Sequence, residues 1–280
     1  MKINVKCPVC DLEIVKEKKS YKCDNNHIYD ISKSNYINLH LSQYKKSSNP
    51  GDSKEMMKSR KSFLDNGYYE ILSKYLIKYI ESISLESNSK ILDLGCGEGY
   101  YLNEVEKYFI NNRMEKFVLT GIDISKEAIL LASKRKLKSN LIVASANQLP
   151  FFDKSFDIVY SIFSPVFEQE ILRVMKEDGI CIVIGPGEEH LLELASYVYD
   201  KVLPHKGNHQ VLDNSNDFRL EEEIEIKEYI NIIGSNILNL LKMTPYYWQI
   251  NESKKSKLLN LDNLKVKIHF SIKTYKILNT

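Results

Sequence analysis

The sequence has no run of apolar residues close to the ~20 that a helix needs to span a bilayer, although 43% of its 280 residues are hydrophobic. Residues 1–7 also lack the apolar core of a secretory signal peptide. These two absences argue against a membrane protein and against export. We therefore expect a globular cytoplasmic protein without a membrane partner, long enough for one large domain and one small domain.

A disulfide framework is not expected either, because five cysteines are an odd number and the chain lacks an export signal. Cys96 and Cys181 are expected to be small buried residues in a glycine-rich loop and an apolar strand. The other three cysteines form, with a histidine, the pattern C-x2-C-x12-C-x3-H: Cys7, Cys10, Cys23 and His27. Three thiolates and one imidazole fill all four positions of a structural zinc site, and zinc would order a segment too short to bury its own core.

Two other interpretations of these four residues stay open. They could be unrelated side chains of a flexible leader, or Cys7 and Cys10 could form a redox centre. No βαβ pattern surrounds Cys7-Pro8-Val9-Cys10, which disfavours the redox centre.

A strong net charge is missing as well, since the chain carries only +2 at pH 7. The charges are unevenly distributed, however. Residues 1–61 hold thirteen Lys and Arg against seven Asp and Glu, and the remainder holds twenty-six against thirty. A basic front on a faintly acidic body suggests that the front meets a polyanion, with solubility as the equal alternative.

The segment 90–101 is the part around which we expect the larger domain to be organised. Residues 90–94 form a short apolar run suited to a strand buried in a parallel sheet. Three glycines follow at alternate positions: Gly95, Gly97 and Gly99. Without a Cβ they let backbone amides approach a ligand, and a helix over about 98–109 would direct its N-terminus toward it. A second strand over 117–122 ends beside Asp123, where doubly wound folds bind ribose hydroxyls.

The spacing of the glycines distinguishes between nucleotide ligands. A dinucleotide site has G-x-G-x-x-G, whereas this sequence has Asp-Leu-Gly-Cys-Gly-Glu-Gly. Glu98 would repel a pyrophosphate but suits a ligand with a sulfonium and an ammonium group. The stretch resembles the nucleoside-binding motif of class I S-adenosylmethionine (SAM) methyltransferases. This resemblance implies SAM as cofactor and an α/β, Rossmann-like fold with a seven-strand mixed sheet, here joined to a small N-terminal zinc-binding domain.

Three motifs together resemble the bacterial 23S rRNA guanine-N1 methyltransferases of the RlmA family. They are the four zinc-type residues, the segment 50–69 beginning Pro-Gly-Asp-Ser, and residues 93–101. Further similar segments are 149–152, 185–191 and 243–246. The resemblance implies methylation of N1 of one guanine in a 23S rRNA hairpin, which would be the partner. The family has two neighbouring targets, and a composition rich in Lys, Asn and Ile, which suggests a low-GC bacterium, weakly favours the one linked to tylosin-type macrolide resistance.

The expected domains are a zinc-binding RNA-recognition domain (1–45), a linker and helix (46–66), and a SAM-dependent methyltransferase domain (67–280). The linker has turn chemistry at Pro50-Gly51, and Asp52 or Ser53 could cap the helix after it. Two zinc modules on one RNA leave a homodimer open.

Two aspartates are the main binding residues expected from the motifs. Asp93 would hold loop amides or the methionyl ammonium, and Asp123 the ribose. The adenine contact would fall to Asn147 or Gln148, for which a simple loop role is an equal alternative. The resemblance places Tyr69 and His190 beside SAM. The complete predicted set is Tyr69, Asp93, Gly95, Gly97, Gly99, Tyr101, Leu102, Asp123, Asn147, Gln148 and His190.

No single residue is predicted to be the general base. The fourth strand, 156–163, ends by the methyl group in this fold, so 161–165 would line the catalytic pocket. Guanine N1 carries a proton at neutral pH, so an acceptor must lie near it. The pocket candidates are Ser164, Pro165 and His190, with Glu189 as a further acceptor. A strand exit that simply ends at a proline is the alternative.

Alternation of apolar and polar residues predicts that 222–232 and 266–277 are the last two strands, paired antiparallel. Residues 203–216 are polar and rich in turn residues, so we expect an exposed loop. The aromatic residues of 244–248 could stack on a base, but core packing is the favoured use. A small-molecule methyltransferase and a non-catalytic binding module that retains SAM are the competing functions.

Overall fold

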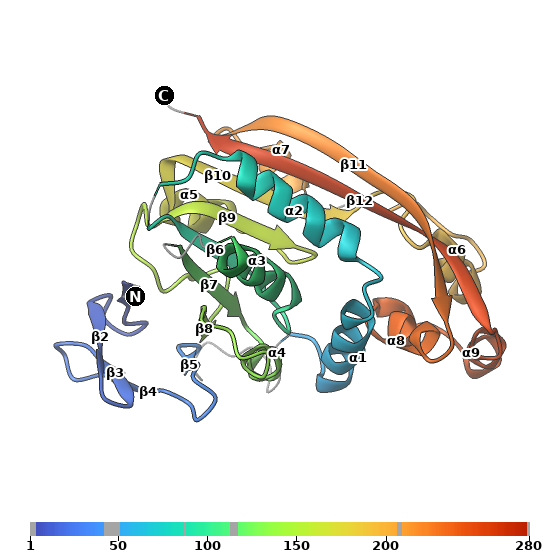
Figure 1. The fold of residues 1–280 in the computed structure, drawn as a ribbon, viewed down its shortest axis with the longest axis horizontal. Helices are drawn as coiled ribbons and strands as arrows, with labels where there is room; N and C mark the ends of the chain where they lie inside the picture. Colours follow the sequence, from blue (N-terminus) through green and yellow to red (C-terminus); the bar gives the residue numbers. More distant parts are fainter. Residues whose placement is uncertain (1–3, 42–50, 87, 113–116, 206–208, 279–280) are drawn as a thin grey trace.

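The computed structural model describes residues 4–41, 51–86, 88–112, 117–205 and 209–278. These residues form a four-stranded antiparallel sheet and an eight-stranded mixed sheet (Figure 1). Residues 46–50 of the expected linker lie outside the described ranges. Among the described helices, none has both the length and the apolar character needed to cross a bilayer.

The centre of the large sheet is parallel. Its strands are β6 (Lys90–Leu94), β7 (Val118–Asp123), β8 (Asn140–Val143), β9 (Phe156–Ile162) and β10 (Met175–Pro186). In the order β10-β9-β6-β7-β8 the chain first runs outward from β6 to β8 and then restarts on the other side at β9. The two directions diverge between β6 and β9, and a doubly wound sheet binds its ligand at the carboxyl ends of strands at such a switch point.

Two long antiparallel strands and one short strand complete the large sheet. The predicted C-terminal pair is confirmed as β11 (Phe218–Ile233) and β12 (Asn263–Ile277), with β12 beside β10. The expected seven strands are joined by an eighth, β5 (Ile37–Asn38), which pairs parallel with β8. The difference arises because β8 has a free edge that the N-terminal segment reaches.

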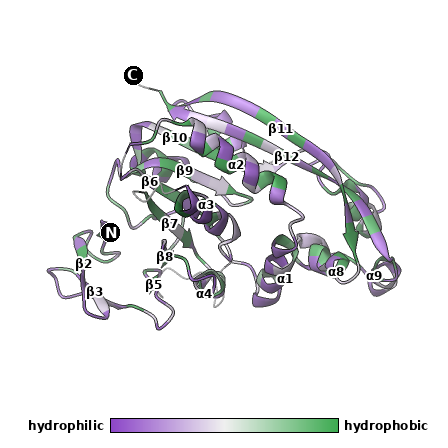
Figure 2. Cartoon of the chain, viewed as in Figure 1, coloured by the Kyte–Doolittle hydropathy of each residue, from purple (hydrophilic) through white to green (hydrophobic). Residues whose placement is uncertain are grey.

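Helices cover both faces of this sheet. They are α1 (Lys54–Asp65), α2 (Glu70–Ser82), α3 (Tyr100–Asn111), α4 (Lys126–Ser133), α5 (Glu168–Val174), α6 (Leu192–Val198), α7 (Gln210–Asp213), α8 (Asn236–Lys242) and α9 (Glu252–Leu259), with a 3-10 turn η2 (Pro245–Trp248). Ser53, one of the two residues expected to cap α1, does so, and Ser125 caps α4. The segment expected to be an exposed loop contains α7, and α9 was not anticipated. The strands β7 and β8 consist mainly of hydrophobic residues, whereas the residues of α9 are mainly hydrophilic (Figure 2).

The zinc-type residues lie in the turns of a small sheet, whose strands are β1 (Val5–Lys6), β2 (Glu13–Glu17), β3 (Ser20–Lys22) and β4 (Ile28–Asp30). This module is hydrogen bonded to the large domain, because the Lys6 amide donates to the Pro150 carbonyl (2.9 Å) and Val5 bridges Phe151. Phe151 is fully buried beneath it. The expected unit 1–45 therefore shares both a sheet and a core with the rest of the chain, and its boundaries stay a prediction.

Candidate functional site: a cofactor crevice and a zinc cluster

The four predicted metal ligands converge. Their ligand atoms all lie within 4.8 Å of one another, with Cys10 Sγ 3.7 Å from Cys23 Sγ and His27 Nδ1 3.3–3.5 Å from the three sulfurs. A tetrahedral zinc with ordinary Zn–S and Zn–N bonds requires edges of about 3.8 and 3.5 Å. The donor set and the spacing therefore fit structural zinc, bound through Nδ1 of the histidine.

Two tight turns position these ligands. The Asp11 amide donates to the Cys7 carbonyl and the Asn26 amide to the Cys23 carbonyl, both at 2.9 Å. Asp11 and Asn26 adopt positive φ (58° and 62°), a conformation that Asp and Asn tolerate better than most residues. The hydroxyl of Tyr29 lies 3.1 Å from Cys7 Sγ and is placed to donate to a thiolate.

The glycine loop lies directly after β6. Its first two amides, of Gly95 and Cys96, donate to the Ile122 carbonyl at 2.9 and 2.8 Å, which ties the loop to β7. A Cβ on Gly95 would overlap the Ser164 hydroxyl, whereas one on Gly97 would meet no atom within 4 Å. Gly95 therefore permits a close approach of the β9 exit, and Gly97 borders open space at the switch point.

Asp93 and Asp123 both lie at this loop. Asp93 is 2% exposed, and its Oδ2 has no hydrogen-bond partner among the described residues. Burial raises its pKa well above the ordinary value, while the neighbouring Tyr160 hydroxyl lowers it. A buried carboxylate oxygen without a partner is expensive. The site therefore fits a ligand that brings a cation or hydrogen-bond donors to Asp93.

Asp123 holds the loop through both carboxylate oxygens. Oδ2 accepts from the Gly97 amide (2.9 Å) and Oδ1 from the Ser125 amide (2.7 Å). Burial raises its pKa, and these two hydrogen bonds followed by the charge of Arg60 lower it. Each oxygen keeps acceptor capacity, so the carboxylate can also receive a pair of hydroxyl donors.

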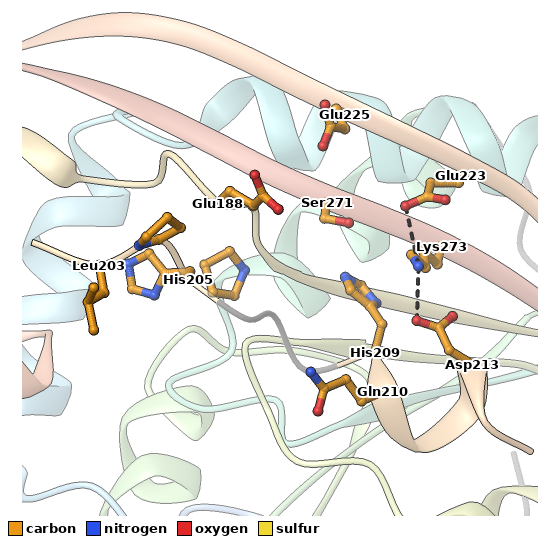
Figure 3. A pocket seen from close by; sticks show the side chains of 13 residues that line it. Glu188, Leu203, His205, His209, Gln210, Asp213, Glu223, Glu225, Ser271 and Lys273 are labelled. Atoms are coloured by element: carbon orange, nitrogen blue, oxygen red, sulfur yellow. Dashed lines mark hydrogen bonds and ion pairs between the residues drawn. The ribbon is translucent and has the colours of Figure 1, made fainter.

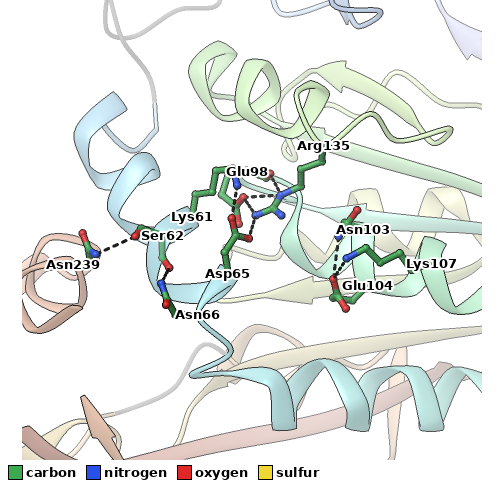
Figure 4. A network of polar contacts seen from close by, with 10 residues as sticks. All are labelled: Lys61, Ser62, Asp65, Asn66, Glu98, Asn103, Glu104, Lys107, Arg135 and Asn239. Atoms are coloured by element: carbon green, nitrogen blue, oxygen red, sulfur yellow. Dashed lines mark hydrogen bonds and ion pairs between the residues drawn. The ribbon is translucent and has the colours of Figure 1, made fainter. Parts of the chain in front are cut away.

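Glu98 has a different role from the expected one. Its side chain is 1% exposed and forms an ion pair with Arg135, which also binds Asp65 at the end of α1 (2.8 Å; Figure 4). The charge expected to face the ligand is therefore neutralised inside the protein. The network instead links the glycine loop, α1 and the end of α4, and it was not visible in the sequence because Asp65, Glu98 and Arg135 are far apart.

Tyr69 and His190 meet in the structure, although 121 positions separate them. Tyr69 Oη lies 3.2 Å from His190 Nε2, and His190 Nδ1 accepts from the His269 amide (3.2 Å). Burial, followed by the charges of His205 and His269, lowers the pKa of His190 to about 3. The ring is neutral at physiological pH, and since Nδ1 is an acceptor, Nε2 carries the hydrogen and donates to Tyr69. The Tyr69 hydroxyl hydrogen can then point to a ligand.

Phe163 is a site residue that the sequence analysis did not single out. It is 41% exposed, and its φ of 53° is strained for a bulky residue. Its ring is stacked on Tyr69 (centroids 6.4 Å apart) and lies 5.6 Å from that of His190. An exposed aromatic ring held in a strained conformation at the end of β9 offers a flat face beside the glycine loop.

Arg60 is the second residue that was not anticipated. It forms an ion pair with Asp52 (2.6 Å). Burial raises the pKa of Asp123, Tyr69 and Tyr101, and the charge of Arg60 opposes this rise at all three groups. In the sequence it stands between Lys58 and Lys61, in a pattern typical of a solvated basic helix face. The structure instead places it at the crevice.

Of the remaining predicted residues, some lie at the crevice, one is a core residue and two are exposed on a turn. Tyr101 has a buried hydroxyl without a partner among the described residues, and Ser164 and Pro165 follow Phe163 at the crevice. Leu102 is fully buried and packs over Gly121, so its side chain is a core residue. Asn147 and Gln148 are exposed on the turn after β8.

A pocket of about 700 Å³, lined mostly by charged and polar residues, adjoins the crevice (Figure 3). It lies between the end of β10, the β11–β12 face, residues 203–205 and the start of α7. Lys273 is held in it between Asp213 (2.9 Å) and Glu223 (3.3 Å). His205, which lines the pocket, is 6.1 Å from His190 between ring centroids, so the pocket opens next to the Tyr69–His190 pair.

The fold and the crevice define a class: an α/β protein of the class I SAM-dependent methyltransferase type. A family model described as a methyltransferase domain matches residues 85–229, and one described as RlmA, N-terminal, a zinc ribbon, matches residues 5–48. The chain belongs to the methyltransferase domain family. Its cofactors are SAM and structural zinc, and the resemblance noted in the sequence is confirmed.

Individual relatives agree with this assignment. A Bacillus subtilis (strain 168) protein provisionally named 23S rRNA (guanine-N(1)-)-methyltransferase is 28% identical over 273 residues, 95% of each chain. The 23S rRNA (guanine(748)-N(1))-methyltransferase of Streptomyces fradiae is 27% identical over 192 residues, 68% of this chain and 66% of the relative. The crystal structure of the YcgJ protein from Bacillus subtilis aligns with a TM-score of 0.50 and 14% identity, over 76% of this chain and 100% of that one. The last likeness supports the fold alone.

Proposed function

We propose that this chain is a cytoplasmic enzyme that methylates N1 of a guanine in a hairpin of 23S rRNA. The observation that carries the proposal is a complete Cys3His cluster in the same chain as the cofactor crevice, matched to the RlmA zinc ribbon. A small-molecule methyltransferase has no need of such a module. The names of the two relatives support the same substrate.

SAM, when bound, supplies an electrophilic methyl group on a sulfonium. In this proposal Asp93 receives the methionyl ammonium, Asp123 the ribose hydroxyls, and the Tyr69 hydroxyl a third polar contact. Phe163 presents its ring to the target base, which must be unstacked or already looped out to enter. Holding N1 in line with the methyl group accounts for most of the catalysis, because displacement at a sulfonium needs mainly orientation.

The backbone of residues 163–165 is where we place the hydrogen-bond acceptor that orients N1–H, and the N1 proton leaves to water once the methyl group has been transferred. Both ring nitrogens of His190 are engaged. Glu189 forms ion pairs with Lys267 and Lys227, which lower its pKa and make it a weaker base. The Ser164 carbonyl already receives the Ser161 hydroxyl at 3.1 Å and keeps a second lone pair.

Incubation with methyl-labelled SAM tests the substrate directly. Unmodified 23S rRNA is expected to acquire one methyl group per molecule, whereas a mixture of small metabolites acquires none. Primer extension then locates the modified guanine. Label in the metabolite fraction and none in the RNA would contradict the proposal and support a small-molecule enzyme.

The finer proposal is that the target is the macrolide-linked one of the two neighbouring guanines. The support is the composition rich in Lys, Asn and Ile; the name of the Streptomyces fradiae relative shows that one such enzyme acts on guanine 748. A primer-extension stop at the other guanine of the hairpin would refute it without affecting the enzyme class.

Replacing His190 with glutamine should preserve most of the activity, whereas alanine should lower it substantially. Glutamine can accept from the His269 amide through its oxygen and donate to Tyr69 through its nitrogen. Because the pKa of His190 is depressed to about 3, its neutral form is present at all pH values above that range, and kcat should show no inflection from this residue between pH ~5 and ~9. An inflection near neutral pH that disappears in His190→Gln would instead make His190 the general base.

A further inference from the structure

Trp248 is the single tryptophan of the chain and is 63% exposed. It ends η2, in which Tyr246 is buried at 9% exposure. The core packing expected for these aromatic residues therefore applies to Tyr246 and not to Trp248. An indole ring of this exposure forgoes the free energy that burial would supply, so it is a candidate contact for a partner.

Lysine side chains and a second aromatic ring surround this indole. The Tyr247 ring packs edge to face against it at 5.2 Å, and the ammonium groups of Lys242 and Lys255 lie over the Tyr247 ring at 5.6 and 5.2 Å. We call these two rings and two lysines the tryptophan patch: Tyr247, Trp248, Lys242 and Lys255. The three helices packed at this place, α1, α8 and α9, carry seven lysines and one arginine against three carboxylates, which are Glu55, Asp65 and Glu252.

The tryptophan patch adjoins the cofactor crevice. Its helices α8 and α9, with α1 packed on α8, lie along one side of the molecule, and the zinc module lies at the opposite end (Figure 1). Arg60 of α1 donates to the Met243 carbonyl (3.4 Å), next to η2. The Tyr246 hydroxyl lies 3.0 Å from Nε2 of His205, which in turn neighbours His190. Trp248 is thus two residues along the chain from Tyr246, whose hydroxyl reaches the edge of the reaction site.

We propose that the tryptophan patch binds unpaired nucleotides of the RNA next to the target guanine. Trp248 stacks on a base, and the lysines contact the adjacent phosphates. The inference rests on the proposed function and adds to it a contact surface outside both the zinc module and the crevice. A guanine that must leave its stack has neighbours that are also exposed, and an indole can stabilise them in that state.

The charge of the patch favours RNA over a second copy of the chain. A two-fold contact would place the same surface on both sides of the interface, so lysines would face lysines. RNA supplies both the phosphates and the flat bases that this combination of side chains binds.

The fluorescence of Trp248 provides a site-specific test, because no other tryptophan contributes. Excited at the red edge of its absorption, the wild-type emission should be quenched on titration with an unmodified 23S rRNA hairpin transcript and little affected by a fully paired RNA duplex. Trp248→Ala should weaken binding of the transcript, measured by filter retention, about tenfold or more. Trp248→Phe should restore most of the affinity, since phenylalanine also stacks.

Tyr229 offers a matched control. It is 51% exposed and lies beneath two lysine ammonium groups, Lys265 and Lys267, at 4.8 and 5.1 Å. It belongs, however, to β11, whose sequence Phe-Arg-Leu-Glu-Glu-Glu-Ile-Glu is strongly acidic. Tyr229→Ala should therefore leave RNA affinity unchanged. If both alanine variants bind RNA equally well, the inference is wrong.

Two outcomes separate this inference from the proposed function. Transcript bound and methylated without any change in Trp248 emission would overturn the inference alone. Quenching without methyl transfer to any RNA would support the inference and contradict the proposed function. Emission that shifts on dilution of the protein, and not with RNA, would assign the patch to a second copy and also overturn the inference.

Discussion

Replacing Asp123 with alanine is expected to abolish measurable SAM binding. The substitution removes the proposed ribose acceptor and the two main-chain hydrogen bonds that shape the loop, from Gly97 and Ser125. Each hydrogen bond to a charged group is worth about 1.5–3 kcal/mol, so the loss of two ribose contacts alone lowers affinity about 100-fold or more. Isothermal calorimetry with SAM measures the change.

A matched control lies at the other end of the same sheet. Asp157 accepts from the Lys90 amide (2.7 Å) at the start of β6, far from the glycine loop. Asp157→Ala should reduce thermal stability but leave SAM affinity near the wild-type value. Wild-type affinity in Asp123→Ala would refute the ribose assignment, and an equal loss in both variants would attribute the effect to the fold.

Replacing Cys23 with serine is expected to remove zinc, unfold the zinc module and weaken RNA binding, while SAM binding largely persists. Structural zinc contributes about 10–16 kcal/mol to the folding of small zinc-binding peptides, and the module has few other sources of stability. The cofactor crevice is formed by β6, β7, β9 and the loop after β6. The hydrogen bonds that hold its residues in place do not involve the zinc module and should remain in the variant. Metal analysis, calorimetry with SAM and RNA filter binding measure the three effects.

Cys181 provides the corresponding control, since it is fully buried in β10 and lies outside the metal cluster. Cys181→Ala should keep one zinc per chain. A Cys23→Ser protein with wild-type zinc content would contradict the assignment of the cluster. A zinc-free protein with unchanged affinity for RNA would leave the metal site in place and remove its role in RNA recognition.

Local patterns in the sequence were sufficient for much of the site. The metal ligands lie in two short segments, so their spacing predicted them before any fold was known. Asp93 and Asp123 lie at the carboxyl ends of consecutive parallel strands, and such ends must meet at one edge of the sheet. By contrast, the partners of Glu98 and of His190 are distant in sequence and were brought together only by packing. No periodicity encodes that Glu98 is neutralised by Arg135.

Exposure was the other property that the sequence could not provide. Residues 244–248 contain three aromatic side chains in a row, and each is of a type that commonly packs in a core. The short 3-10 turn directs Tyr246 inward and leaves Trp248 outside. The exposure of Phe163 was equally hidden in the sequence. Phe163 follows β9 and itself adopts a left-handed backbone conformation, which turns its ring out of the sheet.

The strand β5 has a consequence for attempts to dissect this enzyme. Since Ile37–Asn38 pairs with β8 and Val5 covers Phe151, a shortened chain that starts after the zinc module would present an unprotected edge strand and a bare phenylalanine. Such edges recruit strands from other molecules. A catalytic fragment prepared in this way should self-associate, and inactivity of that fragment would report aggregation rather than the loss of RNA recognition.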